Sequence, residues 1–444
     1  MKKILILGAG LSSSSLIKYL LDHSIEHNWK IKIGDIEKEI AEQKINKHPN
    51  GEGFKFDVFN DNQRENEIKN VDVVISMLPA RMHYLAAKDC VKHSVHMITA
   101  SYVSPEIREL NNEAKKKGVL LLNEIGVDPG IDHMSAMKII DKINEDGGTL
   151  EHFRSYTGGL VAPESDNNPW NYKFTWNPRN VVLAGQGVSK FLLNGKYKYI
   201  PYNKLFSRTE IVAVPEYGNF EVYANRDSLS YREVYNLQHV KTLYRGTMRR
   251  PGYCESWNVF VQLGLTDDTY LIEDSENMTY RDFIDSYLSY SDSVSVEEKV
   301  AKYVDISIDS DIMKKIAWTG IFESKKIGLT KATPAQILQK LLVEKWGLDK
   351  NDIDMIVMQH RFHYTKNNRK KLLVSSLVVK GIDTVHTAMS ITVGIPVAIA
   401  TKMLLTGKMT CTGVQVPISK EIYEPVLKEL EEWKIKFIEE EFDV

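Results

Sequence analysis

Short apolar runs alternate with amphipathic stretches along the first 125 residues of the chain. Six of these runs are rich in β-branched residues, which is typical of strands buried on both faces of a parallel sheet. The intervals show helical spacing, as in the stretch 107–117, which Ser104-Pro105-Glu106 opens and Gly118 ends. The pattern predicts a doubly wound α/β domain with strands at 3–7, 31–34, 54–58, 71–78, 95–99 and 119–123.

The pattern changes after Pro129-Gly130. Apolar residues between 134 and 143 recur at helical spacing and predict a helix that leaves the first domain. Residues 149–253 are rich in Tyr, Trp, Asn and Gly with short strand-like runs, whereas 266–350 are charged and predict helices. The runs 353–361 and 371–379 predict a β-hairpin across Asn367-Asn368. From His386 onward the chain predicts helices, interrupted by a loop at 411–417.

These changes of pattern predict three domains on an α/β fold. A dinucleotide-binding Rossmann domain with a doubly wound parallel sheet covers 1–130, and the C-terminal segment 386–444 is expected to pack back on it. A mixed α/β substrate-binding domain covers 131–265 and 351–385. A small helical insertion domain covers 266–350. The long apolar hairpin from 353 to 379 favours a homodimer.

Charge and cysteine content narrow the class of protein. Lys and Arg number 57 and Asp and Glu 59, so the chain lacks the basic excess that nucleic-acid binding needs. No apolar run approaches the ~20 residues of a membrane span, so we expect neither partner. The cysteines Cys90, Cys254 and Cys411 form no CxxC pair, which argues against a disulfide framework and a zinc site. We expect a cytoplasmic protein without a metal.

A glycine-rich turn directly follows the first predicted strand and opens a helix. It reads GxGxxG with Ser13 in the place of the third glycine. In this motif the glycines permit the tight turn and the close approach of a pyrophosphate to a helix N-terminus, which favours anions. The alternative is a glycine turn in a fold that binds no nucleotide. The expected cofactor contacts are Gly8, Gly10, Leu11, Ser12 and Ser13.

The strand ends add further candidates for cofactor binding. Asp35 ends the second strand, 25 residues after Gly10, where a carboxylate binds a ribose 2′-hydroxyl and repels a 2′-phosphate. This predicts NAD, with NADP left open by Lys38. Asp57 either flanks the adenine or caps a turn. Ser76 and Leu78 end the fourth strand at the switch point of the sheet, where ligands bind.

The segments after the fifth and sixth strands also point to chemistry. Residues 99–102 read Thr-Ala-Ser-Tyr and residues 124–133 follow the sixth strand, so both are placed to face a nicotinamide. Further polar motifs occupy 158–164, 168–176, 225–228 and 244–249. Thr99 and Ala100 are the candidates for the nicotinamide side. Val127 and Thr175 are further candidates for cofactor binding.

These motifs together resemble the family of saccharopine reductase, the glutamate-forming saccharopine dehydrogenase, and the corresponding half of the bifunctional enzyme of lysine degradation. The resemblance runs from Ile4 to about Pro425. It rests on Thr-Ala-Ser-Tyr at 99–102, Asp-Pro-Gly-Ile-Asp-His at 128–133, Asn-Arg-Asp-Ser at 225–228 and Arg-Gly-Thr at 245–247. The chain departs from the family at Ala80, where Tyr is usual, at Val161, where Pro is usual, and at Arg250-Pro251.

The resemblance implies an oxidoreductase that interconverts saccharopine with L-glutamate and 2-aminoadipate 6-semialdehyde. A hydride passes between the carbon of the secondary amine and NAD(P), and the imine is hydrolysed. Such a substrate has three carboxylates, which arginines clamp well. The implied substrate-binding residues are Ser101, Tyr102, Asp128, Arg226, Arg245, Gly246 and Thr247, with Arg249 as a further candidate clamp.

The sequence leaves the base for proton transfer open. Candidates are Asp128, Tyr102, His133 and Lys173, of which His133 titrates nearest neutrality. The alternatives without a catalytic role are a helix-capping Asp128 and a satisfied core His133. Two other functions remain as alternatives. One is a carboxyspermidine-type dehydrogenase on the same scaffold. The other is an inactive nucleotide-binding homologue, which Ala80 and Val161 would favour.

Overall fold

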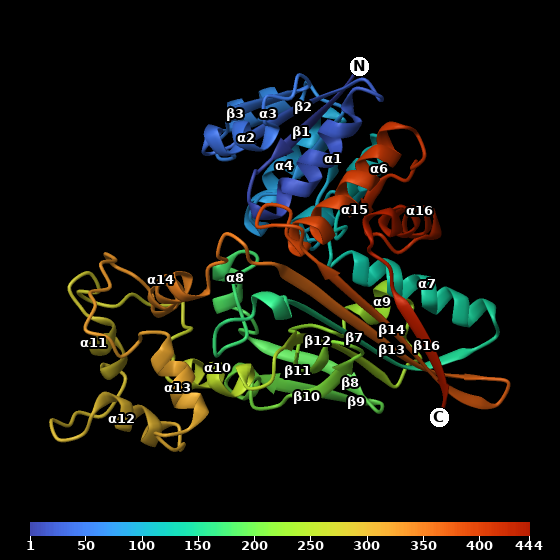
Figure 1. Ribbon diagram of the computed structural model, residues 1–444. Coiled ribbons are helices and arrows are strands. Elements are labelled where there is room, and N and C mark those ends of the chain that lie inside the picture. Colours follow the sequence, from blue (N-terminus) through green and yellow to red (C-terminus); the bar gives the residue numbers. More distant parts are fainter. The chain divides into compact units, whose positions relative to one another are not determined.

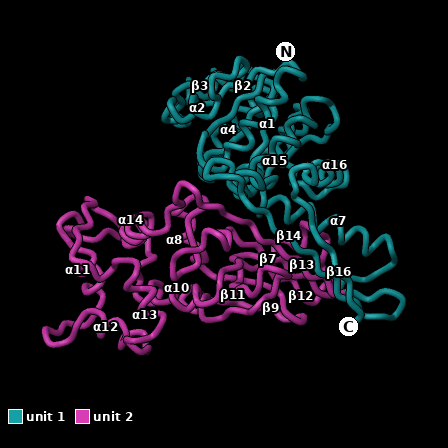
Figure 2. Tube along the Cα trace, in the orientation of Figure 1, with its two compact units in different colours: residues 1–150, 364–444 teal, residues 151–363 magenta.

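The computed structural model describes residues 1–444, and the chain divides into two compact units. Unit 1 combines Met1–Leu150 with Tyr364–Val444, and unit 2 is Glu151–His363 (Figure 2). The helical segment 266–350 therefore belongs to unit 2. The finer division into three domains stays a prediction.

Unit 1 contains a fully parallel sheet of seven strands, in the order β15-β6-β5-β4-β1-β2-β3. Figure 1 labels β1, β2 and β3 of this sheet. Its central strand has no solvent exposure from Ile4 to Leu7, as expected for a strand covered on both faces. The order reverses beside β1, which has β2 on one side and β4 on the other. This confirms the doubly wound α/β class. The strands are β1 (Lys2–Leu7), β2 (Trp29–Asp35), β3 (Gly51–Lys55), β4 (Val73–Ser76), β5 (His96–Ile98), β6 (Leu120–Leu122) and β15 (Gly413–Gln415).

Helices connect the strands of this sheet. One expected helix, 107–117, is split at Leu110 into two short helices. Ser104 caps the first of them, since its Oγ accepts a hydrogen bond from Ile107 N at 3.3 Å. The helices of unit 1 are α1 (Ser14–Ser24), α2 (Lys38–Ile45), α3 (Asp61–Ile68), α4 (His83–His93), α5 (Pro105–Glu109), α6 (Asn111–Lys116), α7 (Ile131–Glu145), α15 (Ala388–Leu405) and α16 (Lys420–Leu430).

The late helix α15 packs tightly against α1. A Cβ added to Gly394 would lie 2.9 Å from the backbone nitrogen of Leu16, so only glycine allows this approach. Ser390 Oγ accepts a hydrogen bond from Ser15 N at 3.0 Å. α15 is long and apolar enough to span a membrane, with a mean hydropathy of 1.7, but 78% of that stretch is buried within the fold. This burial is typical of a core helix.

Two predictions for the C-terminal segment were wrong. The expected loop at 411–417 contains β15, which joins the sheet edge beside β6. The expected helix beyond residue 430 ends in β16 (Ile438–Asp443), which pairs antiparallel with β14 (Arg369–Lys380). β15 has three residues, too few to show alternation, and β16 is exposed throughout. Both are strands because a distant partner offers hydrogen bonds, a cause that local pattern does not contain.

Unit 2 is built on a mixed sheet, which confirms the second part of the fold class. Its strands follow the order β10-β11-β12-β7-β13; β12 is parallel to β7 and antiparallel to β11. β13 leads through Asn367 and Asn368, both with positive φ, into β14, as a tight hairpin turn requires. The strands are β7 (Thr149–Val161), β8 (Val188–Leu193), β9 (Lys196–Pro201), β10 (Glu210–Val214), β11 (Gly218–Ala224), β12 (Thr242–Arg249) and β13 (Asp354–Lys366).

Helices follow or interrupt this sheet, and two of them contribute to an aromatic core. Trp170 is fully buried and contacts the rings of Trp257, Phe260 and Trp346. Its indole N–H donates to the carbonyl of Lys315 at 2.9 Å, so the buried polar atom is satisfied. The helices of unit 2 are α8 (Pro178–Val182), α9 (Tyr231–Val234), α10 (Tyr253–Gln262), α11 (Tyr280–Asp285), α12 (Val296–Tyr303), α13 (Asp311–Trp318) and α14 (Pro334–Trp346).

Candidate active site

The glycine turn after β1 has the shape of a phosphate cradle. Gly8 has φ +98°, and a Cβ there would lie 2.7 Å from the carbonyl oxygen of Met77, so no other residue fits. A Cβ on Gly10 would meet nothing within 4 Å, so the space beside it is open. Leu11 is exposed, whereas Ser13 is buried and its Oγ donates to Gly10 O at 2.8 Å. The turn therefore fits a dinucleotide pyrophosphate at the start of α1.

Asp35 lies beside this turn at the end of β2. Its Oδ2 accepts a hydrogen bond from Ala9 N at 2.6 Å and its Oδ1 accepts one from Glu37 N at 3.1 Å. Lys38, the residue that left NADP open, pairs with Glu42 at 2.8 Å on the surface of α2. The acidic end of β2 thus lies where a ribose is expected.

The remaining cofactor candidates of the first four strands differ in their surroundings. Asp57 Oδ1 accepts a hydrogen bond from Phe59 N at 2.9 Å, the turn-capping alternative for this residue. Its place beside an adenine stays a prediction. Ser12, in the glycine turn, and Leu78, just after β4, are both half-buried. Each of these two side chains therefore keeps some surface that a ligand could cover.

A buried serine–histidine pair lies at the end of β4. The serine was a candidate from the sequence, whereas the histidine was not. Ser76 Oγ lies 2.7 Å from Nδ1 of His83, at the start of α4. Burial lowers the pKa of His83 to about 4, so the ring is neutral at physiological pH. Its Nε2 has no hydrogen-bond partner. No local signal marks His83, whose role comes from the fold around Ser76.

The segments after β5 and β6 meet through one carboxylate. Glu124 has φ +59°, an uncommon backbone state for a non-glycine residue that often marks functional segments. Its Oε1 accepts a hydrogen bond from Val103 N at 3.0 Å, and its Oε2 lies 2.8 Å from Nε2 of His133. His133 has no solvent exposure. Glu124 was not a candidate, although a carboxylate directly after a buried strand was the available signal.

The neighbouring candidates on these segments differ in exposure. Thr99 is fully buried, and its Oγ1 accepts a hydrogen bond from Ser101 N at 3.3 Å. Tyr102 is 52% exposed, so its phenol is accessible to a ligand. Ala100 and Ser101, which lie between these two residues in the sequence, are half-buried. The Thr-Ala-Ser-Tyr motif thus runs from the core to the surface of unit 1.

A closed turn presents Val127 and Asp128 at the start of α7. Gly126 N donates to the carbonyl of Pro129 at 2.8 Å. A Cβ on Gly130, which has φ +147°, would overlap Gly126, so the glycine of the motif is required sterically. At this helix start, Asp132 Oδ1 accepts a hydrogen bond from Gly130 N at 2.6 Å.

The Asn-Arg-Asp-Ser and Arg-Gly-Thr motifs come together in unit 2. Arg245 N donates to Ser228 Oγ at 2.9 Å, and Thr247 Oγ1 donates to Asn225 Oδ1 at 2.5 Å. Gly246 lies opposite Ala224, and a Cβ on it would lie 2.3 Å from the side chain of Val222. The structure therefore brings these substrate-binding candidates into one cluster.

The arginines of the cluster differ in environment. The guanidinium of Arg245 is buried and lies 3.9 Å from the ring centroid of Tyr231. Arg226 is exposed, while its carbonyl accepts a hydrogen bond from Lys190 N at 2.9 Å, which fixes the backbone. Arg249 is 4% exposed and lies over three tyrosine rings. Its Nε has no partner, and its part in carboxylate binding stays a prediction.

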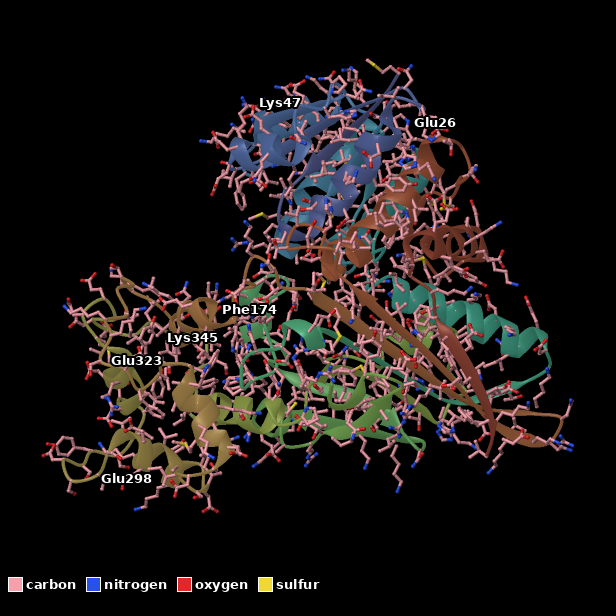
Figure 3. The ribbon with its side chains drawn as sticks, in the orientation of Figure 1. Glu26, Lys47, Phe174, Glu298, Glu323 and Lys345 are labelled. Carbon is pink, nitrogen blue, oxygen red and sulfur yellow. The ribbon has the colours of Figure 1, made fainter.

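The segment 168–176 gives its two candidates different surroundings. Lys173 is 2% exposed and donates to Asp352 at 2.5 Å and to Asp349 at 3.0 Å. Burial lowers its pKa, but these hydrogen bonds outweigh burial and the pKa is raised overall. This geometry favours a structural ion pair over a base. Thr175 is buried with an unpartnered Oγ1, one residue after Phe174, which Figure 3 labels.

No group of three or more His, Cys, Asp or Glu side chains is arranged to hold a metal ion. The open pyrophosphate turn, the acidic end of β2 and the switch point beside β1 instead suit a nicotinamide dinucleotide. The fold and site define a nicotinamide-dependent oxidoreductase.

Comparison with known families then gives the particular group. The saccharopine dehydrogenase NADP binding domain matches residues 4–122, and the saccharopine dehydrogenase C-terminal domain matches residues 126–435. The chain belongs to the saccharopine dehydrogenase family.

Relatives and solved structures agree with this family. The chain is 32% identical over 453 residues to saccharopine dehydrogenase [NADP(+), L-glutamate-forming] of Schizosaccharomyces pombe, covering 100% of both chains. It is 36% identical to the mitochondrial alpha-aminoadipic semialdehyde synthase of Bos taurus, over 97% of this chain and 46% of the relative. The apo L-Glu-forming saccharopine dehydrogenase of Saccharomyces cerevisiae matches in structure with a TM-score of 0.89 and 30% identity, over 100% of both chains.

Proposed function

We propose that this protein is an L-glutamate-forming saccharopine dehydrogenase of lysine metabolism. The observation that carries the proposal is the cluster of Arg226, Arg245 and Thr247 on unit 2, in a chain whose unit 1 has the dinucleotide turn. Saccharopine has three carboxylates, and guanidinium groups bind carboxylates in bidentate fashion. Two of the fungal relatives carry this activity in their names, which supports the same assignment.

The reaction divides between the cofactor and the side chains. When bound, the nicotinamide would supply the hydride acceptor for the CH2 carbon beside the secondary amine of saccharopine, the carbon that becomes the aldehyde. The electron pair of the nitrogen then forms the imine, water adds to its carbon, and the C–N bond breaks to give glutamate and the semialdehyde. The amine must be neutral before hydride leaves, so a group of the chain takes its proton.

Asp128 and Tyr102 are the groups that suit this proton transfer. Asp128 is half-buried on the closed 126–130 turn, directly before Pro129. Tyr102 is exposed enough to reach a ligand. His133 is fully buried against Glu124, so we assign this pair to positioning of the turn. Lys173 is held protonated by its two aspartates and is left out of the mechanism.

For the cofactor, we infer a preference for NAD. Asp35 at the end of β2 and Glu37 just after it are two carboxylates that disfavour a 2′-phosphate, and Lys38 is paired with Glu42. The family description and the names of the fungal relatives point the other way, toward NADP. Steady-state rates with NAD and NADP, run side by side, decide between the two. A higher kcat/KM with NADP would show that Asp35 does not exclude a 2′-phosphate and would contradict this preference.

The proposed function is tested by saccharopine-dependent reduction of the nicotinamide cofactor, followed by absorbance. Glutamate and the semialdehyde should accumulate in equal amounts. Carboxyspermidine, which carries fewer carboxylates, is the comparison substrate. Faster turnover of carboxyspermidine would assign the chain to that class of dehydrogenase. Binding of reduced cofactor without turnover of either substrate would contradict both assignments and favour an inactive homologue.

A further inference from the structure

A lysine from the neighbouring helix holds the back of the dinucleotide turn. Lys44, near the end of α2, donates its ammonium protons to Gly10 O, to Ser14 Oγ at 2.9 Å and to Ser13 Oγ at 3.2 Å. All three acceptors belong to the turn or to the first residue of α1. The side chain thus ties α2 to the part of unit 1 that faces a pyrophosphate.

The charge of this lysine has no carboxylate bonded to it. Its three acceptors are a carbonyl and two hydroxyls, none of which carries a formal charge. The nearby Asp35 gives its oxygens to the amides of Ala9 and Glu37. A half-buried ammonium without a bonded anion is costly, because burial disfavours the charged form. Burial accordingly lowers the pKa of Lys44 to about 8, although Asp35 opposes this, and the group is still largely charged at neutral pH.

We propose that Lys44 is a positioning residue for the cofactor, which supplies positive charge to the pyrophosphate from behind the glycine turn. Holding Gly10 O fixes the turn with its amides toward the open side, and the unneutralised ammonium adds to the favourable field at the N-terminus of α1. In this proposal, the dinucleotide pyrophosphate provides the negative charge that no bonded carboxylate provides for Lys44. The inference rests on cofactor binding by unit 1 and is independent of which amino acid the enzyme oxidises.

The test compares three variants for binding of NADH, NADPH and ADP-ribose by the full-length chain. Lys44→Met should raise the Kd of all three about tenfold. The dependence of Kd on salt should become shallower, because one charge has left the interaction. Lys44→Arg should restore most of the affinity. Lys18→Met is the matched control: this lysine is on α1, is exposed and is paired with Asp22 at 2.8 Å, so its Kd should be unchanged.

Thermal unfolding without cofactor separates this role from a purely structural one. Because the free enzyme gains little from the buried charge, Lys44→Met should keep its melting temperature within about 2 °C. An unchanged Kd would overturn the proposal. A fall in melting temperature with an unaltered salt dependence of Kd would assign Lys44 to structure alone. A loss of affinity confined to NADPH would place its charge at the 2′-phosphate and also overturn the proposal. None of these readouts requires turnover of saccharopine.

Discussion

Cationic side chains in this protein differ chiefly in their surroundings. Lys173 lies between two aspartates, and Arg249 lies among tyrosine rings. Arg226 is exposed, and its backbone carbonyl is held by a hydrogen bond. Burying a charge with its counter-ion makes a structural contact, whereas an exposed and pre-positioned guanidinium is suited to a carboxylate ligand. The residue type alone does not separate these roles.

We expect Arg226→Ala to weaken saccharopine binding and to leave cofactor binding intact. Loss of a carboxylate clamp should raise KM for saccharopine about tenfold or more. The Kd of NADH should be unchanged, because the residue belongs to unit 2. Arg208→Ala, an exposed arginine of the same unit, is the control. A parallel loss of NADH binding would indicate a structural role for Arg226.

We expect Lys173→Met to destabilise the protein by about 3–5 kcal/mol, because it leaves buried Asp352 without its counter-ion. Denaturant unfolding measures this loss. The double variant Lys173→Met/Asp352→Leu should recover much of the stability. The raised pKa of Lys173 means that its charge stabilises the fold at neutral and moderately alkaline pH, and that this contribution is lost as the pH rises above the ordinary lysine value of 10.5 and through the pKa in the folded protein. Loss of turnover in a fully stable variant would instead support a catalytic lysine.

At the scale of elements, local pattern predicted those strands that are buried and the turns that glycine enforces. All six strands expected in the first 125 residues have a counterpart in the parallel sheet, although β3 ends at Lys55. β15 and β16 escaped prediction because each depends on a partner far away in the sequence. Among the candidate site residues, Gly8, Asp35 and the 126–130 turn were indicated by sequence motifs. Lys44 and His83 were not, since nothing near them in sequence indicates the turn or serine that they contact.

The contact between α15 and α1 gives a prediction at this scale. Gly394→Val should lower the melting temperature by several degrees, because its side chain would collide with the backbone of Leu16. Since Leu16 lies on the helix that begins at the dinucleotide turn, NADH affinity should fall as well. Thr406→Ala, at the exposed C-terminal end of α15, is the control and should change neither property. Normal affinity in a destabilised Gly394→Val protein would show that α15 does not order the turn.

At the scale of the whole molecule, the two units are expected to respond differently to ligands. NADH should slow amide exchange in the glycine turn and at the start of α15, because both surround the N-terminus of α1. β10 and β11 of unit 2 should show no such protection. Hydrogen exchange followed by mass spectrometry measures both regions in one experiment. Protection of unit 2 alone would contradict the assignment of cofactor binding to unit 1.

The discontinuity of unit 1 has a consequence for biosynthesis. Its parallel sheet receives β15, and α1 receives α15, from a part of the chain that follows unit 2. A ribosome therefore completes unit 2 while the dinucleotide-binding sheet still lacks an edge strand and a covering helix. The N-terminal 150 residues cannot complete the fold of unit 1 until the last segment has emerged from the ribosome. Nascent chains halted before α15 should accordingly expose the apolar face of α1 and be the species that chaperones hold.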